Sequence, residues 1–339
     1  MRVDTPLTPR ERVLRRLTGD PVDKIPNLNI VMAFAARHIG VKYSQYATDY
    51  RVLAEGNIRC CEDFGIDMVS AISDPCREAG DLGAPVSFPD DDIPMLQGVL
   101  IQDYGDIAAL KPIPPREGRR MLDRIQAIEL YRQLAGRDYP VLGWVEGAFA
   151  ESCDLRGLSN MMVDIATEPE FVRDLLEICT EQAIAFATEQ IKAGADFIGI
   201  GDAAASLIGP KYFESFALPF EKRICDAVHH AGAKVKLHIC GNITPILNQV
   251  ALSGADIVDA DWMVDFHQAA QCMEGICSVC GNFDPVSILL QGSPDDVRKS
   301  VIQCVQAGND ATFVAAGCEV PLHTPAQNLR AVHEALQSL

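Results

Sequence analysis

The chain has 339 residues, of which 48% are hydrophobic and 22% are charged, so it is neither disordered nor collagen-like in its main state. Its 29 basic and 47 acidic residues give a net charge of −18, which makes nucleic acids and anionic membrane surfaces poor partners because their phosphates are repelled. No apolar run reaches the roughly 18 residues of a membrane span, and the first residues lack the apolar core of a signal peptide. We therefore expect a cytoplasmic protein.

Cysteine is unusually frequent, with 12 residues in the chain. In a cytoplasmic protein these should be reduced thiols, and most of them should behave as small buried apolar residues. A few could bind a metal, so their positions relative to the predicted strands are informative.

The predicted elements begin with a helix that Thr8 caps, with Pro9 in its first turn, and that ends at Gly19. Short apolar runs then alternate with helical stretches. The predicted strands are residues 24–30, 66–71, 139–144, 195–200, 233–239, 255–260, 276–280 and 311–316. The clearest predicted helices are residues 46–64, 122–134, 169–193, 210–231, 244–252, 266–273, 294–307 and 325–336.

The strand runs are rich in Val and Ile without clean alternation, which is typical of parallel strands buried on both faces. Glycines such as Gly194, Gly232 and Gly254 follow helices, where a left-handed residue turns the chain back into the next strand. This pattern predicts an α/β fold, a (β/α)8 TIM barrel, as a single domain over residues 1–339. A doubly wound open sheet is the alternative.

An irregular segment, residues 73–115, is rich in Pro, Gly and Asp and follows the second strand. We expect this extended loop region to lie over the mouth of the barrel, where loops build active sites. Its centre contains Asp90, Asp91 and Asp92, which could instead be a solvated loop face.

Polar side chains follow the carboxyl ends of several predicted strands, where the active sites of parallel barrels lie. His238 and Cys240 end the fifth strand, and Cys318 follows the eighth. Residues two apart in a strand share a face, so His238 and Cys240 can reach one ion, and imidazole with thiolate suits Zn²⁺. Cys318 would complete a three-ligand site with one open position, whereas the alternative is a buried histidine beside a core cysteine.

Three carboxylates occupy equivalent places and are candidate catalytic residues: Asp74 after the second strand, Glu146 after the third and Asp202 after the fourth. Glu146 could join the metal or hydrogen-bond a ligand, and Asp74 and Asp202 could instead serve as caps or loop acceptors. A competing cluster, Cys272, Cys277 and Cys280, has the C-x2-C spacing of a zinc knuckle. We predict core thiols there, because no second pair follows.

The motifs LHICGN (residues 237–242) and GCEVP (residues 317–321) resemble the uroporphyrinogen decarboxylase superfamily, and within it the zinc-dependent methylcobamide:coenzyme M methyltransferases. Residues 8–26, 42–46, 201–202 and 216–219 also fit, so the similarity covers nearly the whole chain. It implies a (β/α)8 barrel with His238, Cys240 and Cys318 as zinc ligands. It further implies methyl transfer between a methylcobamide (corrinoid) on a separate corrinoid-binding protein and a small thiol such as coenzyme M.

The departures from the decarboxylases are informative. Their arginine-rich segment after the first strand corresponds here to residues 30–37, which contain only Arg37, and they have a histidine near the position of Cys318. A tetrapyrrole with eight carboxylates would need several cations, and the predicted mouth is acidic. A decarboxylase-type enzyme and a non-catalytic barrel that binds a corrinoid or thiol remain as alternatives.

Overall fold

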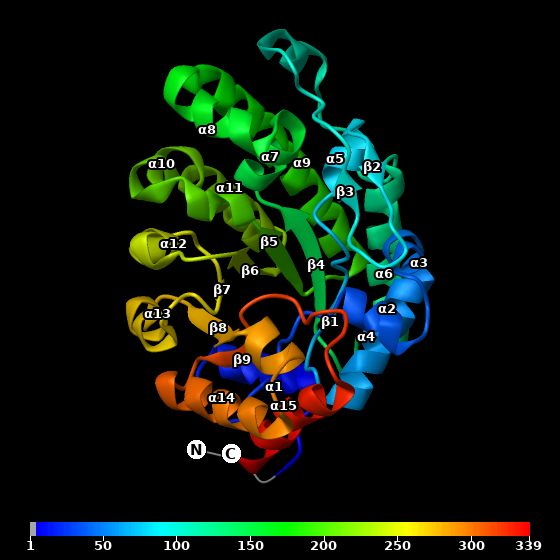
Figure 1. The fold of residues 1–339 in the computed structure, drawn as a ribbon, viewed down its shortest axis with the longest axis vertical. Coiled ribbons are helices and arrows are strands. Elements are labelled where there is room, and N and C mark those ends of the chain that lie inside the picture. The colour runs from blue at the N-terminus through cyan, green and yellow to red at the C-terminus, as the bar shows by residue number, and fades with distance from the viewer. Residues whose placement is uncertain (1–4) are drawn as a thin grey trace.

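Seven parallel strands form one curled sheet in the order β1-β4-β5-β6-β7-β8-β9, with helices around it (Figure 1). The computed structural model describes residues 5–339, so residues 1–4 of the predicted domain lie outside the described residues. The strands are β1 (Val69–Ser70), β4 (Val141–Glu146), β5 (Phe197–Gly201), β6 (Lys234–Ile239), β7 (Ile257–Ala260), β8 (Ser278–Phe283) and β9 (Phe313–Ala316).

The chain before β1 closes this sheet into a barrel. The N–H of Leu28 donates to the carbonyl of Val314 in β9 (2.9 Å), and the N–H of Asp67, just before β1, donates to the carbonyl of Asn27 (2.8 Å). The predicted (β/α)8 barrel is thereby confirmed. The predicted strand 24–30 is wrong in its extent, since only Asn27 forms a bridge, to Val314. Pro26 has no N–H to donate, and the Asp67 side chain takes the N–H of Asn27 (2.8 Å).

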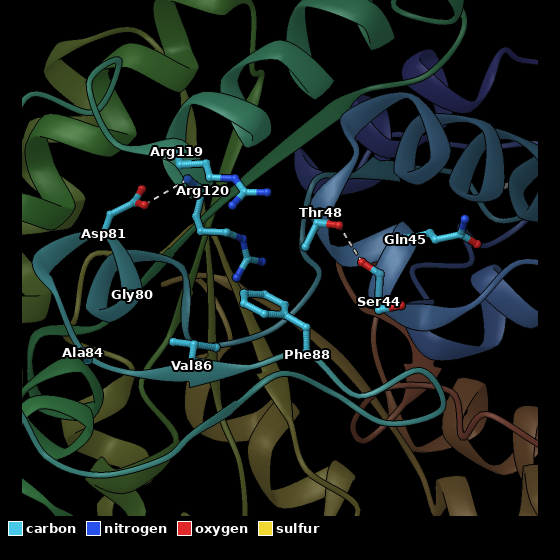
Figure 2. Close-up of a pocket in the computed structure, with 10 residues that line it drawn as sticks. All are labelled: Ser44, Gln45, Thr48, Gly80, Asp81, Ala84, Val86, Phe88, Arg119 and Arg120. Carbon is cyan, nitrogen blue, oxygen red and sulfur yellow. Dashed lines mark hydrogen bonds between the residues drawn. The ribbon is translucent and has the colours of Figure 1, made fainter.

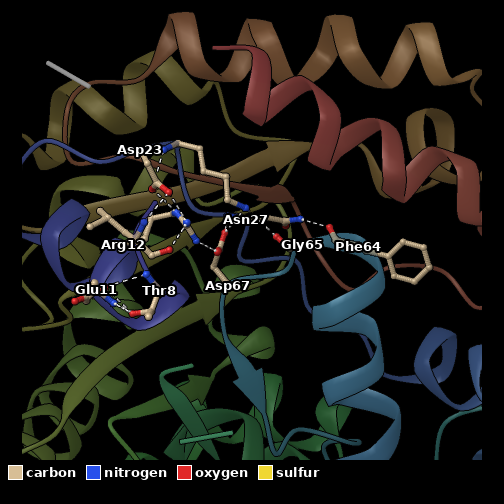
Figure 3. A network of polar contacts seen from close by, with 10 residues as sticks. Thr8, Glu11, Arg12, Asp23, Asn27, Phe64, Gly65 and Asp67 are labelled. Atoms are coloured by element: carbon tan, nitrogen blue, oxygen red, sulfur yellow. Dashed lines mark hydrogen bonds and ion pairs between the residues drawn. The ribbon is translucent and has the colours of Figure 1, made fainter. Parts of the chain in front are cut away.

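A buried polar network locks this closing segment to the first helix, α1 (Pro9–Leu17) (Figure 3). The Arg12 guanidinium forms ion pairs with Asp67 (2.5 Å) and Asp23 (2.7 Å). Thr8 caps α1 as predicted, by accepting the N–H three residues further on. Because Asp67 also accepts from Asn27, one carboxylate joins the helix, the closing segment and the approach to β1.

All the predicted helices are present at least in part, and the structure has further helices outside the predicted ranges. Three have the predicted bounds, namely α9 (Pro169–Ala193), α13 (Phe266–Met273) and α14 (Pro294–Ala307). The others are α1, α2 (Ala33–His38), α3 (Tyr43–Thr48), α4 (Tyr50–Phe64), α5 (Arg77–Leu82), α6 (Arg119–Leu134), α7 (Ala148–Arg156), α8 (Leu158–Thr167), α10 (Gly209–Phe216), α11 (Leu218–His230), α12 (Leu247–Val250) and α15 (Ala326–Ser338). Across residues 5–339, none of the helices is long and apolar enough to cross a membrane.

Three predicted helices are interrupted. The predicted helix 244–252 begins as a 3₁₀ helix (Thr244–Ile246) and continues as α12. The predicted helix 46–64 divides into α3 and α4 at Asp49, whose extended backbone lets its side chain cap α4. The predicted helix 210–231 divides into α10 and α11 at Ala217, because Pro219 lacks the N–H that a continuous helix requires.

The predicted excursion after β1 is present, but it contains regular structure. It includes α5, the antiparallel pair β2 (Val86–Ser87) and β3 (Met95–Leu96), and the 3₁₀ helix η1 (Tyr104–Ala109). Its acidic tip is anchored at Asp90, which accepts hydrogen bonds from Lys42 (2.6 Å) and Ser44 (2.7 Å). The tip therefore packs on α3.

The barrel interior beneath the strand ends is filled by large and polar side chains. Trp144 lies inside, with its ring centroid 6.5 Å from that of His238. Gly199 on the neighbouring strand makes room for the indole, since a Cβ there would lie 2.1 Å from the ring. The core extends continuously from α1 to α15, which supports our proposal that residues 1–339 form one domain.

Candidate active site

The described chain contains one group of three potential metal-binding side chains whose donor atoms all lie within 4.8 Å of one another: His238, Cys240 and Cys318, called here the donor set. His238 Nε2 lies 3.0 Å from Cys240 Sγ and 3.9 Å from Cys318 Sγ, and the two sulfurs are 4.0 Å apart. β6 supplies the first residue and the turns after β6 and β9 supply the cysteines. The structure thus brings the three predicted residues together.

A carboxylate lies behind the imidazole of this set. Asp259 on β7 is the direct register partner of His238, and its Oδ2 lies 3.7 Å from His238 Nδ1, on the far side of the ring from the sulfurs. Lys236, also on the inner face of β6, forms a buried ion pair with Asp259. Metal-binding histidines usually have such a carboxylate behind the ring, where it fixes the orientation and raises the basicity. One imidazole nitrogen and two sulfurs fit the ligands of a zinc site, with the Asp259 carboxylate behind the imidazole.

Residues 261–264, called here the rim loop, contact both of the turns that carry the cysteines. The N–H of Gly241, next to Cys240, donates to Asp261 Oδ2 (2.9 Å), and Asn282 on β8 donates to the Asp261 carbonyl (3.0 Å). Gly317, next to Cys318, lies so close that a Cβ there would be 2.2 Å from the Trp262 nitrogen. The two cysteine turns are therefore held against a common support.

The two thiols of the donor set differ in acidity. The Cys240 thiol and the adjacent His238 lower the pKa of Cys318 despite burial, whereas the contact with Cys318, together with burial, raises the pKa of Cys240. Cys318 is therefore the more acidic of the two thiols, and binding of a metal to both sulfurs would release their remaining protons. Burial, together with the charge on Cys318, raises the pKa of neighbouring Glu319 to about 8.

Glu146, at the end of β4, is buried and paired with Arg77 from α5 (2.8 Å). Its N–H donates to the carboxylate of Glu78 (2.9 Å), and Glu151 of α7 is buried in the same region. Burial raises the pKa of Glu146 well above its usual range, and Arg77 offsets this only in part. The structure therefore places Glu146 in a buried cluster of carboxylates around one arginine, and a catalytic role for it stays a prediction.

Asp74, after β1, is buried and forms a two-pronged ion pair with Arg120 of α6 (2.6 and 3.4 Å). It also accepts from the Ser73 hydroxyl (2.6 Å). Arg120 lines a cavity of about 490 Å³ between α3, α5 and α6. Its guanidinium lies over the Phe88 ring, and Arg119 also lines the cavity (Figure 2). None of the donor set lines this cavity.

Asp202, after β5, is completely buried and accepts the N–H of Ala150 (2.7 Å), in the first turn of α7. A carboxylate there is favoured by the positive end of the helix dipole. Burial raises the pKa of Asp202 to about 7. These contacts are those of a helix cap, and a catalytic role for Asp202 stays a prediction.

The competing cysteine cluster does not gather into a metal-binding group among residues 5–339. Cys280 is buried in β8, Cys277 lies just before that strand, and Cys272 on α13 donates to Asn248 (3.1 Å). The sequence interpretation missed Lys236, Asp259 and Glu319. Lys236 and Asp259 are charged residues inside apolar strands, which is a signal that could have identified them, since such charges are rarely buried unless paired.

Comparisons with known proteins agree with the resemblance seen in the motifs. The chain is 29% identical over 336 residues to the methylcobamide:CoM methyltransferase MtbA of Methanosarcina acetivorans, covering 97% of this chain and 98% of the relative. It is 27% identical over 348 residues to the uroporphyrinogen decarboxylase of Picosynechococcus sp., covering 96% of both chains. A solved methyltransferase from Methanosarcina mazei shares the fold, with a TM-score of 0.91, 24% identity, and coverage of 98% of this chain and 99% of that one.

The family profile described as uroporphyrinogen decarboxylase (URO-D) matches residues 8–339. This chain is therefore a member of the uroporphyrinogen decarboxylase family.

Proposed function

We propose that this chain is a zinc-dependent methyltransferase that moves a methyl group from a methylcobamide, held by a separate corrinoid protein, to a small thiol such as coenzyme M. The observation that carries the proposal is the meeting of His238, Cys240 and Cys318 at the carboxyl ends of β6 and β9. The names of the relatives support it, because several are methylcobamide:CoM methyltransferases.

The donor set determines the charge at the site. Cys240 and Cys318 contribute −2 when both are deprotonated, and His238 contributes none, so the set matches a divalent cation. Zinc bound here would act as a Lewis acid that lowers the pKa of a thiol taking its open position. The Asp259 carboxylate, 3.7 Å from His238 Nδ1, would favour the orientation of the imidazole that this requires. An acceptor thiolate adds one further negative charge, which keeps its sulfur nucleophilic.

The transfer itself takes place between the two substrates. The acceptor sulfur forms a bond to the methyl carbon while the cobalt–carbon bond breaks, and the electron pair of that bond stays on cobalt, which is reduced from Co(III) to Co(I). The thiol proton passes to solvent. The residues of the barrel mouth position the sulfur in line with the methyl group, and such positioning is a large part of catalysis in two-substrate reactions.

Electrostatics disfavours a uroporphyrinogen as substrate. Arg37, the lone arginine of the segment where decarboxylases cluster theirs, is exposed and donates to the Leu322 carbonyl (3.3 Å). Asp92 lies close enough to Glu319 to raise its pKa further. Arg77 and Arg120, at the same end of the barrel, are already paired with Glu146 and Asp74. Carboxylates entering the mouth would therefore lose hydration and meet few unpaired cations, which costs several kcal/mol.

The test measures zinc content and methyl transfer together. We expect about one zinc per chain and, with methylcobalamin and coenzyme M, loss of the methyl-Co(III) spectrum with formation of the methyl thioether. Decarboxylation of uroporphyrinogen without methylation of any thiol would establish the decarboxylase instead. Corrinoid binding without turnover would establish a binding barrel. The cytoplasmic location is part of this proposal and is consistent with the twelve unpaired thiols.

A further inference from the structure

Large apolar side chains are exposed to solvent beside the donor set. Trp262 and Met263 of the rim loop are 45% and 52% exposed, and Leu207, after β5, is 61% exposed. We call these three residues the apolar rim. Exposed apolar side chains that gather at one site usually mark a surface that binds another molecule.

The apolar rim lies on both sides of the turn that carries Cys240. Gly241 in that turn is flanked by Ser206, the neighbour of Leu207, since a Cβ on Gly241 would lie 3.3 Å from the Ser206 hydroxyl. On its other side, Gly241 donates to Asp261, which precedes Trp262. The Trp262 backbone in turn packs against Gly317, next to Cys318. The apolar rim is therefore adjacent in the fold to both turns that carry the cysteines.

Resting on the proposed function, we propose that the apolar rim seats the macrocycle of the methylcobamide. The methyl–cobalt bond stands perpendicular to the corrin plane, so a sulfur held at the donor set reaches the methyl carbon only if the ring lies flat across the mouth. The indole of Trp262 and the thioether of Met263 suit such a ring, because both make favourable contacts with flat polarisable surfaces.

Charge favours the same occupant. The side chains of a corrin ring are mostly uncharged amides, so the ring tolerates the surface of a chain whose net charge is −18. The rim therefore favours a corrin ring by its shape and by the absence of ring carboxylates.

The test uses hydroxocobalamin, which carries no methyl group, with binding measured by equilibrium dialysis through its visible absorption. We expect the variant Trp262→Ala/Met263→Ala to raise the Kd at least ten-fold and to lower kcat/KM for methylcobalamin by a similar factor, with unchanged zinc content. Trp262→Phe should restore much of the binding. Leu252→Ala is the matched control, because Leu252 is equally exposed (56%) but precedes β7, at the opposite end of the barrel.

The outcomes separate this inference from the proposed function. If wild-type protein with zinc demethylates methylcobalamin but the double variant keeps its Kd and kcat/KM, the rim assignment is wrong and the function stands. If the wild type demethylates it with no thiol, the function itself fails. If the double variant loses activity only with protein-bound methylcobamide and binds hydroxocobalamin normally, the rim contacts the carrier polypeptide, which overturns the inference.

Discussion

Replacing Asp259 by Asn tests how the barrel positions His238. The change keeps the shape of the side chain and removes the charge that lies 3.7 Å from His238 Nδ1. Loss of such an outer carboxylate typically weakens metal binding about 10- to 100-fold, or about 1.4 to 2.8 kcal/mol. It also leaves Lys236, which is completely buried, without its counter-ion, and breaking a buried pair in this way costs about 3–5 kcal/mol of stability.

These two effects can be separated with a second variant. Lys236→Met/Asp259→Asn removes both charges, so most of the stability should return, while the loss of zinc affinity should remain. Stability is measured by urea unfolding, and zinc affinity by competition with a chromophoric chelator. If the double variant binds zinc as tightly as wild type, the loss in Asp259→Asn comes from repulsion by Lys236. The carboxylate would then not act through His238, and our reasoning would be refuted.

Three further predictions concern the donor set, the core thiols and the closing network. His238→Ala and Cys318→Ala should each lose zinc and methyl transfer with little change in the unfolding midpoint of the metal-free protein; full turnover in both would contradict the site. Cys280→Ala should cost about 1–2 kcal/mol of stability by urea unfolding and leave zinc content unchanged. The Arg12 pair holds the pKa of Asp23 at about 2 against the opposing effect of burial, so its stabilisation is complete above pH about 4 and is lost as the pH falls towards 2. Asp23→Asn should be less stable at pH 7 and should flatten this part of the stability profile; an unchanged profile would exclude the pair as its cause.

The sequence predicted the donor set because parallel barrels impose simple rules. Residues two apart on a strand share a face, and strand ends meet at one mouth, so His238, Cys240 and Cys318 could be placed from their positions alone. The three helices predicted with correct bounds have equally local causes. Each begins at a proline or a capping residue, as at Ser293, which caps α14.

The partners of the carboxylates could not be predicted in this way. Arg77 reaches Glu146 across 69 residues, and Asp202 caps a helix 52 residues earlier, so both contacts depend on how separate βα units pack together. The pairing of Lys236 with Asp259 depends on the register between two neighbouring strands, which local patterns leave open. Local rules therefore predicted which residues reach the mouth, and tertiary packing determined which of them are paired.

The closure of the barrel between its first and last segments has a consequence for how the chain folds. The N–H of Ala316 donates to the side chain of Asn29 across 287 residues, and Leu28 bonds to Val314 over a similar span. During synthesis, residues 26–29 have no strand to pair with on this side until β9 leaves the ribosome. Loop closure over such a distance carries a large entropic cost, so we expect the last step of folding to be slow. A chain shortened to end before Phe313 would keep His238 and Cys240. It would have two open sheet edges, and such edges are sites of aggregation.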